Sequence, residues 1–254
     1  MVTRQDRILE TVVQRGKAEV SALADELGVS QVTIRKDLDE LVLRRLIRRE
    51  RGYAVLISQD DPAGRIAYHH TNKKLIAQAV TATIQDGQTV MIEAGSCCAL
   101  LAEEITRTRR GTTIVTNSAF IAERVRRQPG AHIVLLGGDY QADSQVLVGP
   151  MTSLCVDTFL VDRLFIGTDG YTDRLGFTGR DQMRAAAVQA MARRAERVEI
   201  LTESEKFGRH GPVPLLTADQ VAAVWTDAAI ADDYVTALTA AGVTVNKVKE
   251  EQES

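Results

Sequence analysis

The chain has few cysteines and aromatic residues, and it lacks a long hydrophobic run. Its 254 residues contain three cysteines, Cys97, Cys98 and Cys155, and only 4% aromatic residues. These cysteines are too few for a disulfide framework and do not have zinc-type spacing, so we expect reduced thiols, no metal site and no cofactor. A redox role for Cys97 and Cys98 remains an open alternative. No apolar stretch approaches the length of a membrane span or a signal peptide, so we expect a cytoplasmic protein without a membrane partner.

The composition is that of a globular protein, with 44% hydrophobic residues, 26% charged residues and a formal net charge of −3. Residues 1–56 carry 11 Lys and Arg against 9 Asp and Glu, a net charge of +2, which leaves −5 for residues 57–254. The length suits a small domain followed by a larger one. This charge asymmetry predicts that nucleic-acid binding, if present, resides in the first domain.

Three helical patterns begin the chain, over residues 4–14, 20–27 and 30–42. Gly28 and Val29 supply a tight turn between the second and third patterns, and Ser30 is typical of an N-cap. The spacing predicts that the third helix buries Ile34 and Leu38. It also predicts an outward face that carries only hydrogen-bonding and cationic side chains, and this arrangement indicates a helix-turn-helix.

The outward face of the third helix provides the first candidate DNA contacts. Arginine and lysine can donate to guanine or to phosphate, while glutamine and threonine can contact base edges. The alternative is the solvated face of a small helical bundle, or helices that bind only protein. The candidate residues on this helix are Ser30, Gln31, Thr33, Arg35 and Lys36.

A β-hairpin rich in arginine is predicted to follow the third helix. Five arginines fall within residues 44–51, interleaved with apolar residues, and Gly52 separates two short extended runs. Guanidinium groups form paired hydrogen bonds with phosphate oxygens, so Arg48, Arg49 and Arg51 are further candidate DNA contacts. Because acidic residues lie nearby, a hairpin without a ligand remains the alternative.

The polar segment 58–65 is predicted to be a linker, so we expect a DNA-binding domain over 1–57, a larger domain over 66–249 and a tail over 250–254. A helix is expected from Ile66 to Ile84. Beyond it, strand-like runs alternate with helical patterns, which predicts a doubly wound α/β domain with a mostly parallel sheet. The expected strands are 89–93, 113–116, 132–136, 164–167, 197–201, 223–225 and 243–248.

Small and hydroxylic residues follow the first three of these strands. Ligands of such sheets bind outside the carboxyl ends of the strands, and backbone N–H groups at turns and helix starts can bind anions. Glycines that merely end strands are the alternative. The candidate effector residues at these turns are Glu93, Gly95, Ser96, Cys97, Cys98, Asn117, Ser118, Gly137 and Gly138.

Three charged residues complete the expected site. Lys206 could neutralise a phosphate, Asp169 could accept hydrogen bonds from sugar hydroxyls, and Arg180 is a candidate of lower rank. Each residue considered singly could equally stabilise a turn or face water. Together at one sheet edge they favour a pocket for a polyol phosphate.

These motifs resemble those of the DeoR/GlpR family of bacterial transcriptional regulators over nearly the whole chain. VTIRKDL at Val32–Leu38 is similar to the recognition-helix signature TIRRDL. EAGS, VTNS, LLGG, FIGTDG and SEKFG, which begin at residues 93, 115, 135, 165 and 204, are similar to sensor-domain motifs. GFTGRDQMR at Gly176–Arg184 resembles the YciT-like branch. The resemblance implies a winged helix-turn-helix domain followed by a sensor domain related to the ribose-5-phosphate isomerase and CoA-transferase fold.

Four positions depart from that family pattern. Glu93 stands where the family commonly has Asp, Cys97 replaces a threonine hydroxyl, Tyr53 interrupts a Gly-Gly pair in the wing, and Arg45 replaces a glycine. The loss of the hydroxyl at Cys97 favours a different effector or weaker phosphate binding.

The expected function is therefore a regulator, most simply a repressor of a carbohydrate-metabolism operon. Its expected partners are double-stranded operator DNA, a small-molecule effector such as a sugar phosphate, and further copies of the chain in a dimer or tetramer. The alternative is an enzyme similar to a sugar-phosphate isomerase, in which Asp169 and Lys206 would transfer protons. No catalytic residues are expected under the first interpretation.

Overall fold

The computed structural model describes residues 3–44, 46–58 and 60–249. The predicted tail over 250–254 lies outside these residues, as do Arg45 and Gln59 of the segments discussed above. The chain divides into two compact units, Met1–His70 and Thr71–Ser254. Each unit has its own hydrophobic core and is described separately below.

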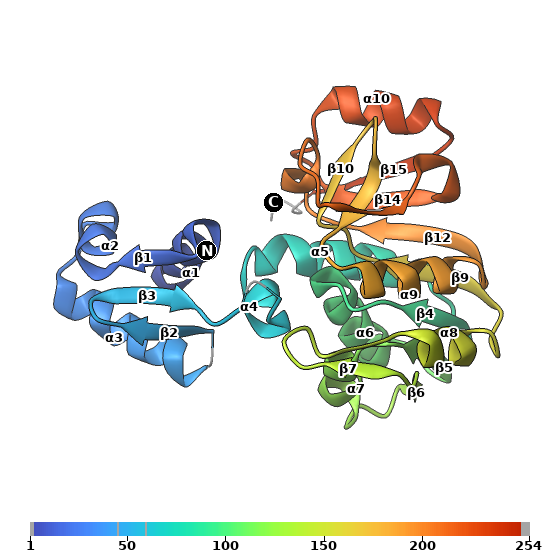
Figure 1. The fold of residues 1–254 in the computed structure, drawn as a ribbon, viewed down its shortest axis with the longest axis horizontal. Coiled ribbons are helices and arrows are strands. Elements are labelled where there is room, and N and C mark those ends of the chain that lie inside the picture. The colour runs from blue at the N-terminus through green and yellow to red at the C-terminus, as the bar shows by residue number, and fades with distance from the viewer. Residues whose placement is uncertain (1–2, 45, 59, 250–254) are drawn as a thin grey trace. The chain divides into compact units, whose positions relative to one another are not determined.

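The N-terminal unit consists of three helices, a three-stranded antiparallel sheet and one short further helix (Figure 1). The structure confirms the three predicted helices and the predicted hairpin. The third strand, β1, pairs with β3 and was not predicted, because only its central residue, Ala18, is buried. The elements are α1 (Arg4–Arg15), β1 (Lys17–Glu19), α2 (Val20–Leu27), α3 (Gln31–Leu43), β2 (Ile47–Glu50), β3 (Tyr53–Leu56) and α4 (Pro62–Ala67).

Local signals in the sequence explain where these helices begin and end. Gly28 ends α2 with a φ of 66°, a left-handed conformation that favours glycine. The Ser30 side chain then accepts a hydrogen bond from the Thr33 N–H and begins α3. The Arg4 side chain donates to both carboxylate oxygens of the buried Asp37, at 2.6 and 3.1 Å, and so joins α1 to α3. That hydrogen bond raises the pKa of Arg4 above its usual value.

The segment after β3 differs from the prediction. Part of the expected linker forms α4, which Asp61 caps by accepting a hydrogen bond from the Gly64 N–H. The continuous helix expected from Ile66 to Ile84 is wrong, because the backbone leaves the helical region at Tyr68 and His69 before α5 (His70–Thr81). The boundaries that we assign to the linker and the two domains remain a proposal.

A seven-stranded sheet forms the centre of the second unit, and every neighbouring pair of its strands is parallel. The structure thus confirms the predicted parallel α/β architecture and all seven expected strands. Their order is β15-β14-β12-β9-β4-β5-β6. Their bounds are β4 (Thr89–Ile92), β5 (Thr112–Thr116), β6 (Ala131–Leu135), β9 (Val161–Ile166), β12 (Ala195–Leu201), β14 (Ala223–Asp227) and β15 (Thr244–Val248).

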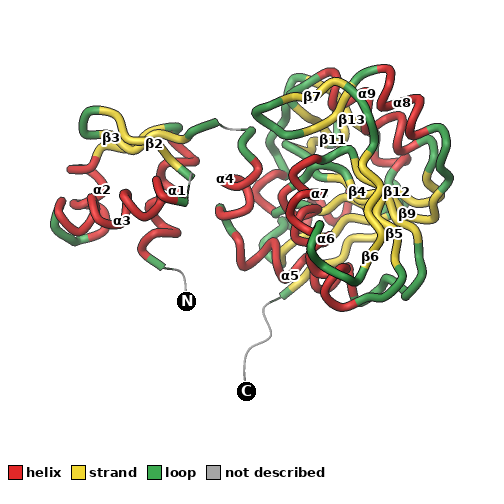
Figure 2. The backbone as a smooth tube through the Cα atoms, turned by 90° about the horizontal axis from the view of Figure 1, so that it is seen from below, coloured by secondary structure: helices red, strands yellow, loops and turns green. Residues whose placement is uncertain are grey.

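Helices cover both faces of this sheet. Figure 2 shows α5, α6 and α7 on one side of the strands and α8 and α9 on the other. This division follows from chain direction, because β4, β5 and β6 proceed toward one edge of the sheet while β9, β12, β14 and β15 proceed toward the opposite edge. The helices are α6 (Ser96–Thr108), α7 (Ala119–Val125), α8 (Pro150–Val156), α9 (Gln182–Ala192) and α10 (Asp232–Ala240).

Two small antiparallel sheets complete the unit and were not predicted. They are the hairpin of β7 (Asp139–Gln141) with β8 (Val146–Val148), and the sheet of β10 (Gly170–Thr172), β11 (Gly176–Gly179) and β13 (Val213–Leu216). Tyr171 of β10 packs against Phe177, Phe207 and Tyr234. Burial raises the pKa of the Tyr171 phenol to about 12, with a smaller contribution from the Asp173 carboxylate. Among the described residues, no helix has the length and apolar character needed to cross a membrane.

Candidate functional site

The first residues of α3 present a mixed polar and apolar surface. Gln31, Arg35 and Lys36 are exposed, as predicted, and their side chains can reach a partner. The Ser30 and Thr33 hydroxyl groups lie 2.9 Å apart, and the Ser30 oxygen also caps the helix. The side chains of these two residues therefore stabilise the start of the helix, in addition to any contact that they make with DNA.

Val32 corrects the prediction that this face carries only hydrogen-bonding and cationic side chains. It lies next to Gln31 at the start of α3, and 73% of its surface is exposed. The helical spacing explains the error, because Val32 is apolar but falls outside the stripe that buries Ile34 and Leu38. An exposed β-branched side chain here can contact the methyl group of thymine in the major groove.

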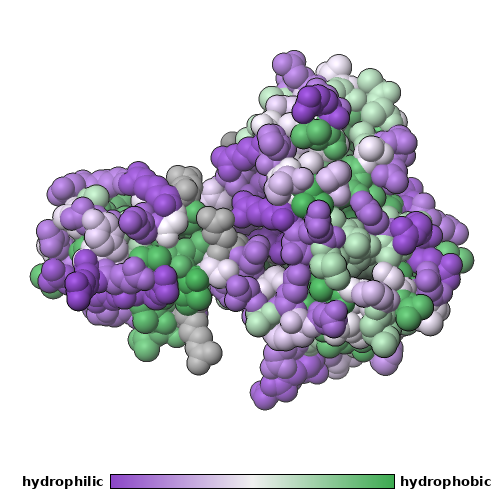
Figure 3. All heavy atoms as spheres, in the orientation of Figure 1, coloured by the Kyte–Doolittle hydropathy of each residue, from purple (hydrophilic) through white to green (hydrophobic). Residues whose placement is uncertain are grey.

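Arg48, Arg49 and Arg51 of the wing are exposed, and the first two form ion pairs. Arg49 lies 2.6 Å from Asp39 of α3, and Arg48 lies 2.9 Å from Glu50. Exposed pairs of this kind contribute little stability and can be exchanged for phosphate contacts. Arg51 lies at the exposed turn between β2 and β3. On the face shown in Figure 3, hydrophilic side chains cover much of the N-terminal unit.

The larger unit brings its candidate residues to the carboxyl edge of the sheet. The direction in which successive strands are added reverses between β4 and β9, and such a reversal is the usual place for a ligand in an open α/β sheet. Gly95 follows β4 and Gly167 follows β9. A methyl group placed on Gly95 would lie 3.2 Å from the Gly167 Cα, so the two backbones approach closely at this point.

The helix that begins beside this reversal can bind an anion. Gly95 is the N-cap of α6 and offers no side-chain hydrogen bond, so the first N–H groups of the helix have no capping side chain. Ser96 is half-buried at the first helical position, whereas Cys97 and Cys98 are buried. Glu93 is also buried, and its N–H donates to the Phe165 carbonyl oxygen. The turn thus combines a positive helix end with one accessible hydroxyl group.

A second group of candidates follows β12, the strand next to β9. Lys206 lies in a short 3₁₀ helix, Ser204–Lys206, and its Nζ atom is 3.0 Å from Glu205 Oε1. The carboxylate of Asp227 fixes this turn, because it accepts from the Ser204 N–H at 2.8 Å and from the Ser204 hydroxyl at 2.7 Å. Half-buried Asp169 follows β9, between Lys206 and the start of α6 in the order of the strands.

Sequence reasoning missed a buried ion pair at this edge. Lys73 of α5 is only 2% exposed, and its Nζ atom lies 3.3 Å from Glu203 Oε1, directly after β12. The signal was present in the sequence, because Lys73 shares the buried stripe of α5 with Ile76, Ala77 and Val80. The pair therefore places two charged side chains out of contact with water at the carboxyl edge of the sheet.

Hydrogen bonds to neighbouring elements of the sensor unit fix the loops after β5 and β6. Asn117 donates to the Leu147 carbonyl oxygen at 3.2 Å, and Ser118 caps α7 by accepting from the Ile121 N–H. The Oδ1 atom of Asn117 is buried and has no hydrogen-bond partner among the described residues. Thr152 of α8 donates to the Gly137 carbonyl oxygen, and its side chain leaves no room for a methyl group on Gly138.

Arg180 lies exposed at the end of β11. It follows Thr178 by two residues, and the Thr178 carbonyl oxygen accepts hydrogen bonds from the Asp169 N–H and the Thr168 hydroxyl group in the turn after β9. The residue after Arg180, Asp181, caps α9 and accepts a hydrogen bond from Gln141 of the β7–β8 hairpin at 3.2 Å. This contact connects the hairpin to the start of α9.

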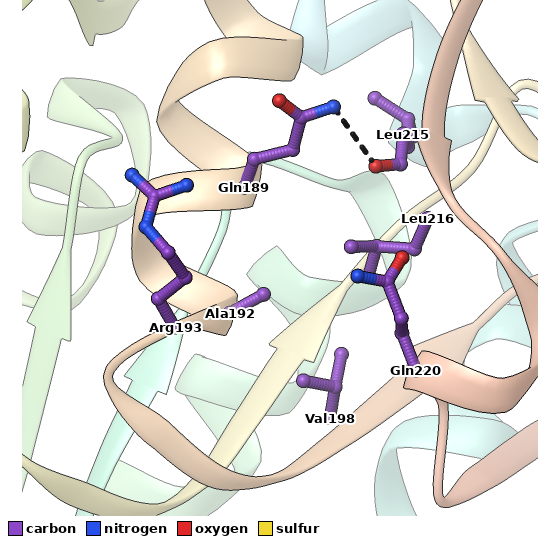
Figure 4. A pocket seen from close by; sticks show the side chains of 7 residues that line it. All are labelled: Gln189, Ala192, Arg193, Val198, Leu215, Leu216 and Gln220. Atoms are coloured by element: carbon purple, nitrogen blue, oxygen red, sulfur yellow. Dashed lines mark hydrogen bonds between the residues drawn. The ribbon is translucent and has the colours of Figure 1, made fainter.

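A cavity of about 440 Å³ occupies a different part of the same unit. Figure 4 shows the side chains of α9, β12, β13 and the following 3₁₀ helix around it, with Gln189 donating to the Leu215 carbonyl oxygen at 3.2 Å. None of the predicted effector residues lines this cavity.

Two family models match the chain. The DeoR-like helix-turn-helix domain matches residues 4–60, and the DeoR C terminal sensor domain matches residues 68–228. The chain belongs to the DeoR family. The α2–α3 pair with its wing is therefore the DNA-binding helix-turn-helix of a transcriptional regulator, and the parallel sheet belongs to the sensor domain.

Curated relatives of this DeoR-family protein are regulators rather than enzymes. The HTH-type transcriptional regulator GlpR of Haloferax volcanii is 29% identical over 95% of this chain and 96% of its own length. The glycerol-3-phosphate regulon repressor of Escherichia coli is 28% identical over 89% and 90%. A putative aga operon transcriptional repressor of Escherichia coli O157:H7 is 26% identical over 97% and 94%.

Solved structures match less closely. Ribose 5-phosphate isomerase A from Neisseria gonorrhoeae shares 14% identity at a TM-score of 0.39, covering 53% of this chain and 52% of that chain. The full-length sorbitol operon regulator SorC from Klebsiella pneumoniae shares 11% identity at a TM-score of 0.42, covering 92% and 98%.

The buried Lys73–Glu203 pair gives a prediction about stability. Replacing Lys73 by methionine removes the cation that lies 3.3 Å from the buried Glu203 carboxylate, so we expect the free energy of unfolding to fall by about 3–5 kcal/mol. The exposed neighbour Lys74→Met is the matched control and should change it by under about 0.5 kcal/mol. Urea denaturation measures both. Equal losses in the two variants would show that the pair is not a buried, coupled ion pair.

Val32 gives a prediction about DNA recognition. If it packs on a thymine methyl group, Val32→Ala should weaken operator binding about fourfold, the worth of roughly one buried methylene. Replacing the contacted thymine by uracil should weaken wild-type binding equally and leave the variant unaffected. Leu43→Ala, at the other end of α3, is the control. A wild-type protein that binds uracil and thymine operators equally, at every thymine tested, would contradict the contact.

Proposed function

We propose that this protein is a repressor of a carbohydrate-metabolism operon whose DNA affinity is controlled by a phosphorylated sugar or a related metabolite. It would act in the cytoplasm on double-stranded operator DNA, as an assembly of two or more copies. The observation that carries the proposal is the reversal of strand direction between β4 and β9, which brings an uncapped helix start beside the turns after β9 and β12.

The dimensions and chemistry of this edge suit such an effector. Neighbouring strands lie about 4.8 Å apart, so the turns after β4, β9 and β12 together span about 10 Å. The N–H groups at Ser96–Cys98 would receive the phosphate, Asp169 the hydroxyl groups, and Lys206 would supply a second positive charge. Because Cys97 is buried, the missing threonine hydroxyl leaves Ser96 as the accessible hydroxyl group of this turn.

Effector binding would reduce repression by changing which arrangement of the DNA-binding domains is populated. Two half-sites on DNA lie about 34 Å apart or at multiples of that distance, so two helix-turn-helix units bind together only at a matching separation. An effector that binds more tightly to a different arrangement shifts the population away from the one that binds DNA. The largest possible loss of DNA affinity equals the ratio of the effector's affinities for the two arrangements. By linkage, operator DNA lowers effector affinity by the same factor.

Lys206 provides the test of the effector site. We expect Lys206→Ala to bind its own upstream DNA normally but to need at least tenfold more sugar phosphate for release, since a hydrogen bond to a charged group is worth about 1.5–3 kcal/mol. DNA-binding titrations against a panel of sugar and polyol phosphates, glycerol 3-phosphate included, provide the measurement.

Lys247→Ala is the matched control, because that lysine lies on the outer strand β15 and pairs with Asp232. If the Lys206→Ala variant leaves the DNA at the same sugar-phosphate concentration as the wild-type protein, Lys206 is not part of the effector site. If no phosphorylated compound releases the wild-type protein from DNA, the proposal of a phosphorylated effector is wrong, but the DNA-binding function is unaffected.

A further inference from the structure

The exposed large apolar side chains of the sensor unit come from one part of the chain. Among the described residues of this unit, all of those with high exposure fall between residues 135 and 183. Leu154 on α8 has 63% of its surface in solvent. We define the apolar patch as the five that lie on or beside β6, β7 and the starts of α8 and α9: Leu135, Tyr140, Met151, Leu154 and Met183.

Short distances connect these elements. The Cγ atom of Met151 lies 3.8 Å from the position of a methyl group placed on Gly137, two residues after Leu135. The Cε atom of Met183 lies 3.6 Å from the same position on Gly149, the N-cap of α8. Leu154 is one helical turn after Met151, so both project from one side of α8. These distances place the elements that carry Leu135, Met151, Leu154 and Met183 side by side.

Charge is sparse on this surface. The Oδ2 atom of Asp139 lies 2.9 Å from the position of a methyl group placed on Gly149, but the two main elements carry no charged side chains. Residues 131–138, which contain β6, and residues 149–156, which contain α8, include no Lys, Arg, Asp or Glu. Because a two-fold contact brings each patch against its own copy, many charges of one sign would make the two copies repel each other, and sparse charge limits that repulsion.

The two outer strands of the main sheet differ in the same respect. β15 carries Lys247, whose Nζ atom pairs with Asp232 at 2.8 Å, and exposed lysine protects an edge strand from pairing with another chain. β6, at the opposite edge, has no strand on its outer side among the described residues and contains no such charge. An unprotected edge next to exposed apolar side chains indicates that something covers it.

The size of the patch fits a subunit contact. Its five side chains leave on the order of 500 Å² in solvent, at the upper end of the largest patches found on monomers. A standard interface takes about 800 Å² from each partner, of which a little over half is apolar. The patch thus supplies roughly the apolar part of one side of such an interface.

We propose that a second copy of this chain covers the patch, in a two-fold contact between the β6 edge and α8 of one copy and the same elements of the other. The inference rests on the oligomer in the proposed function and identifies the surface that forms it. Two copies joined in this way carry two DNA-binding units, as paired half-sites require.

Sedimentation velocity of the full-length protein tests the contact. Met151→Glu combined with Leu154→Glu places two carboxylates on each side of the contact and should halve the mass of the wild-type assembly. Leu175→Glu is the matched control, because this exposed leucine lies between β10 and β11, outside the patch, and its mass should not change. Thermal unfolding followed by circular dichroism verifies that both variants fold, and Met151→Gln with Leu154→Gln, which introduces no charge, should raise the dissociation constant at least tenfold.

The results distinguish the interface from the rest of the function. A folded glutamate variant that keeps the wild-type mass would overturn this surface as the contact, even if another surface joins the copies. A wild-type monomer at micromolar concentration would overturn the oligomer itself. Neither result depends on the effector, so a failed sugar-phosphate titration leaves the test of the interface unchanged.

Discussion

The parallel direction of all seven strands in the main sheet determines where this protein can bind a small molecule. Parallel strands place every loop that leaves a carboxyl end at the same edge. The reversal between β4 and β9 then opens that edge at one position, beside the start of α6. The close approach of Gly95 and Gly167 and the buried pair of Lys73 with Glu203 both lie around this position. The order and direction of the strands thus determine where a ligand site can lie, whichever side chains line it.

The N-terminal unit must hold α3 in a fixed position while leaving one face of this helix exposed. Its core holds α3 through Ile34, Leu38 and Leu41, and the Arg4–Asp37 pair joins that helix to α1. The same helix therefore has a rigid inner face and an outer face open to DNA. Because Arg49 of the wing pairs with the exposed carboxylate of Asp39, phosphate can replace that partner at low cost.

Much of this arrangement could be predicted from the sequence because the signals were local. Periodicity and the Ser30 cap defined α3, and the alternation of strands with helices defined the parallel sheet. Features set by tertiary contacts could not be predicted. The strands of the small sheets have only three or four residues, and β11 begins and ends with glycine. Neither β10 nor β11 therefore shows the alternating pattern of a strand in the sequence.

The candidate site was predictable in position but not in detail. The turns after the strands were identified from small residues, yet Asn117 and Ser118 are engaged by β8 and α7 because an unpredicted hairpin lies against them. Lys73 was missed because a lysine within a helix is normally assigned to the surface. Val32 was missed because the prediction assigned only polar and cationic residues to the outward face and left this apolar residue unassigned.

Hydrogen–deuterium exchange of the full-length protein, with and without the sugar phosphate that releases it from DNA, tests the central claim most directly. We expect slower exchange in peptides that contain residues 95–98, 167–170 and 203–208, because a ligand at the β4–β9 reversal contacts the backbone of all three turns. Unchanged exchange in those turns, with protection instead around Gln189, Arg193 and Gln220, would move the effector to the cavity between α9 and β13 and contradict the account.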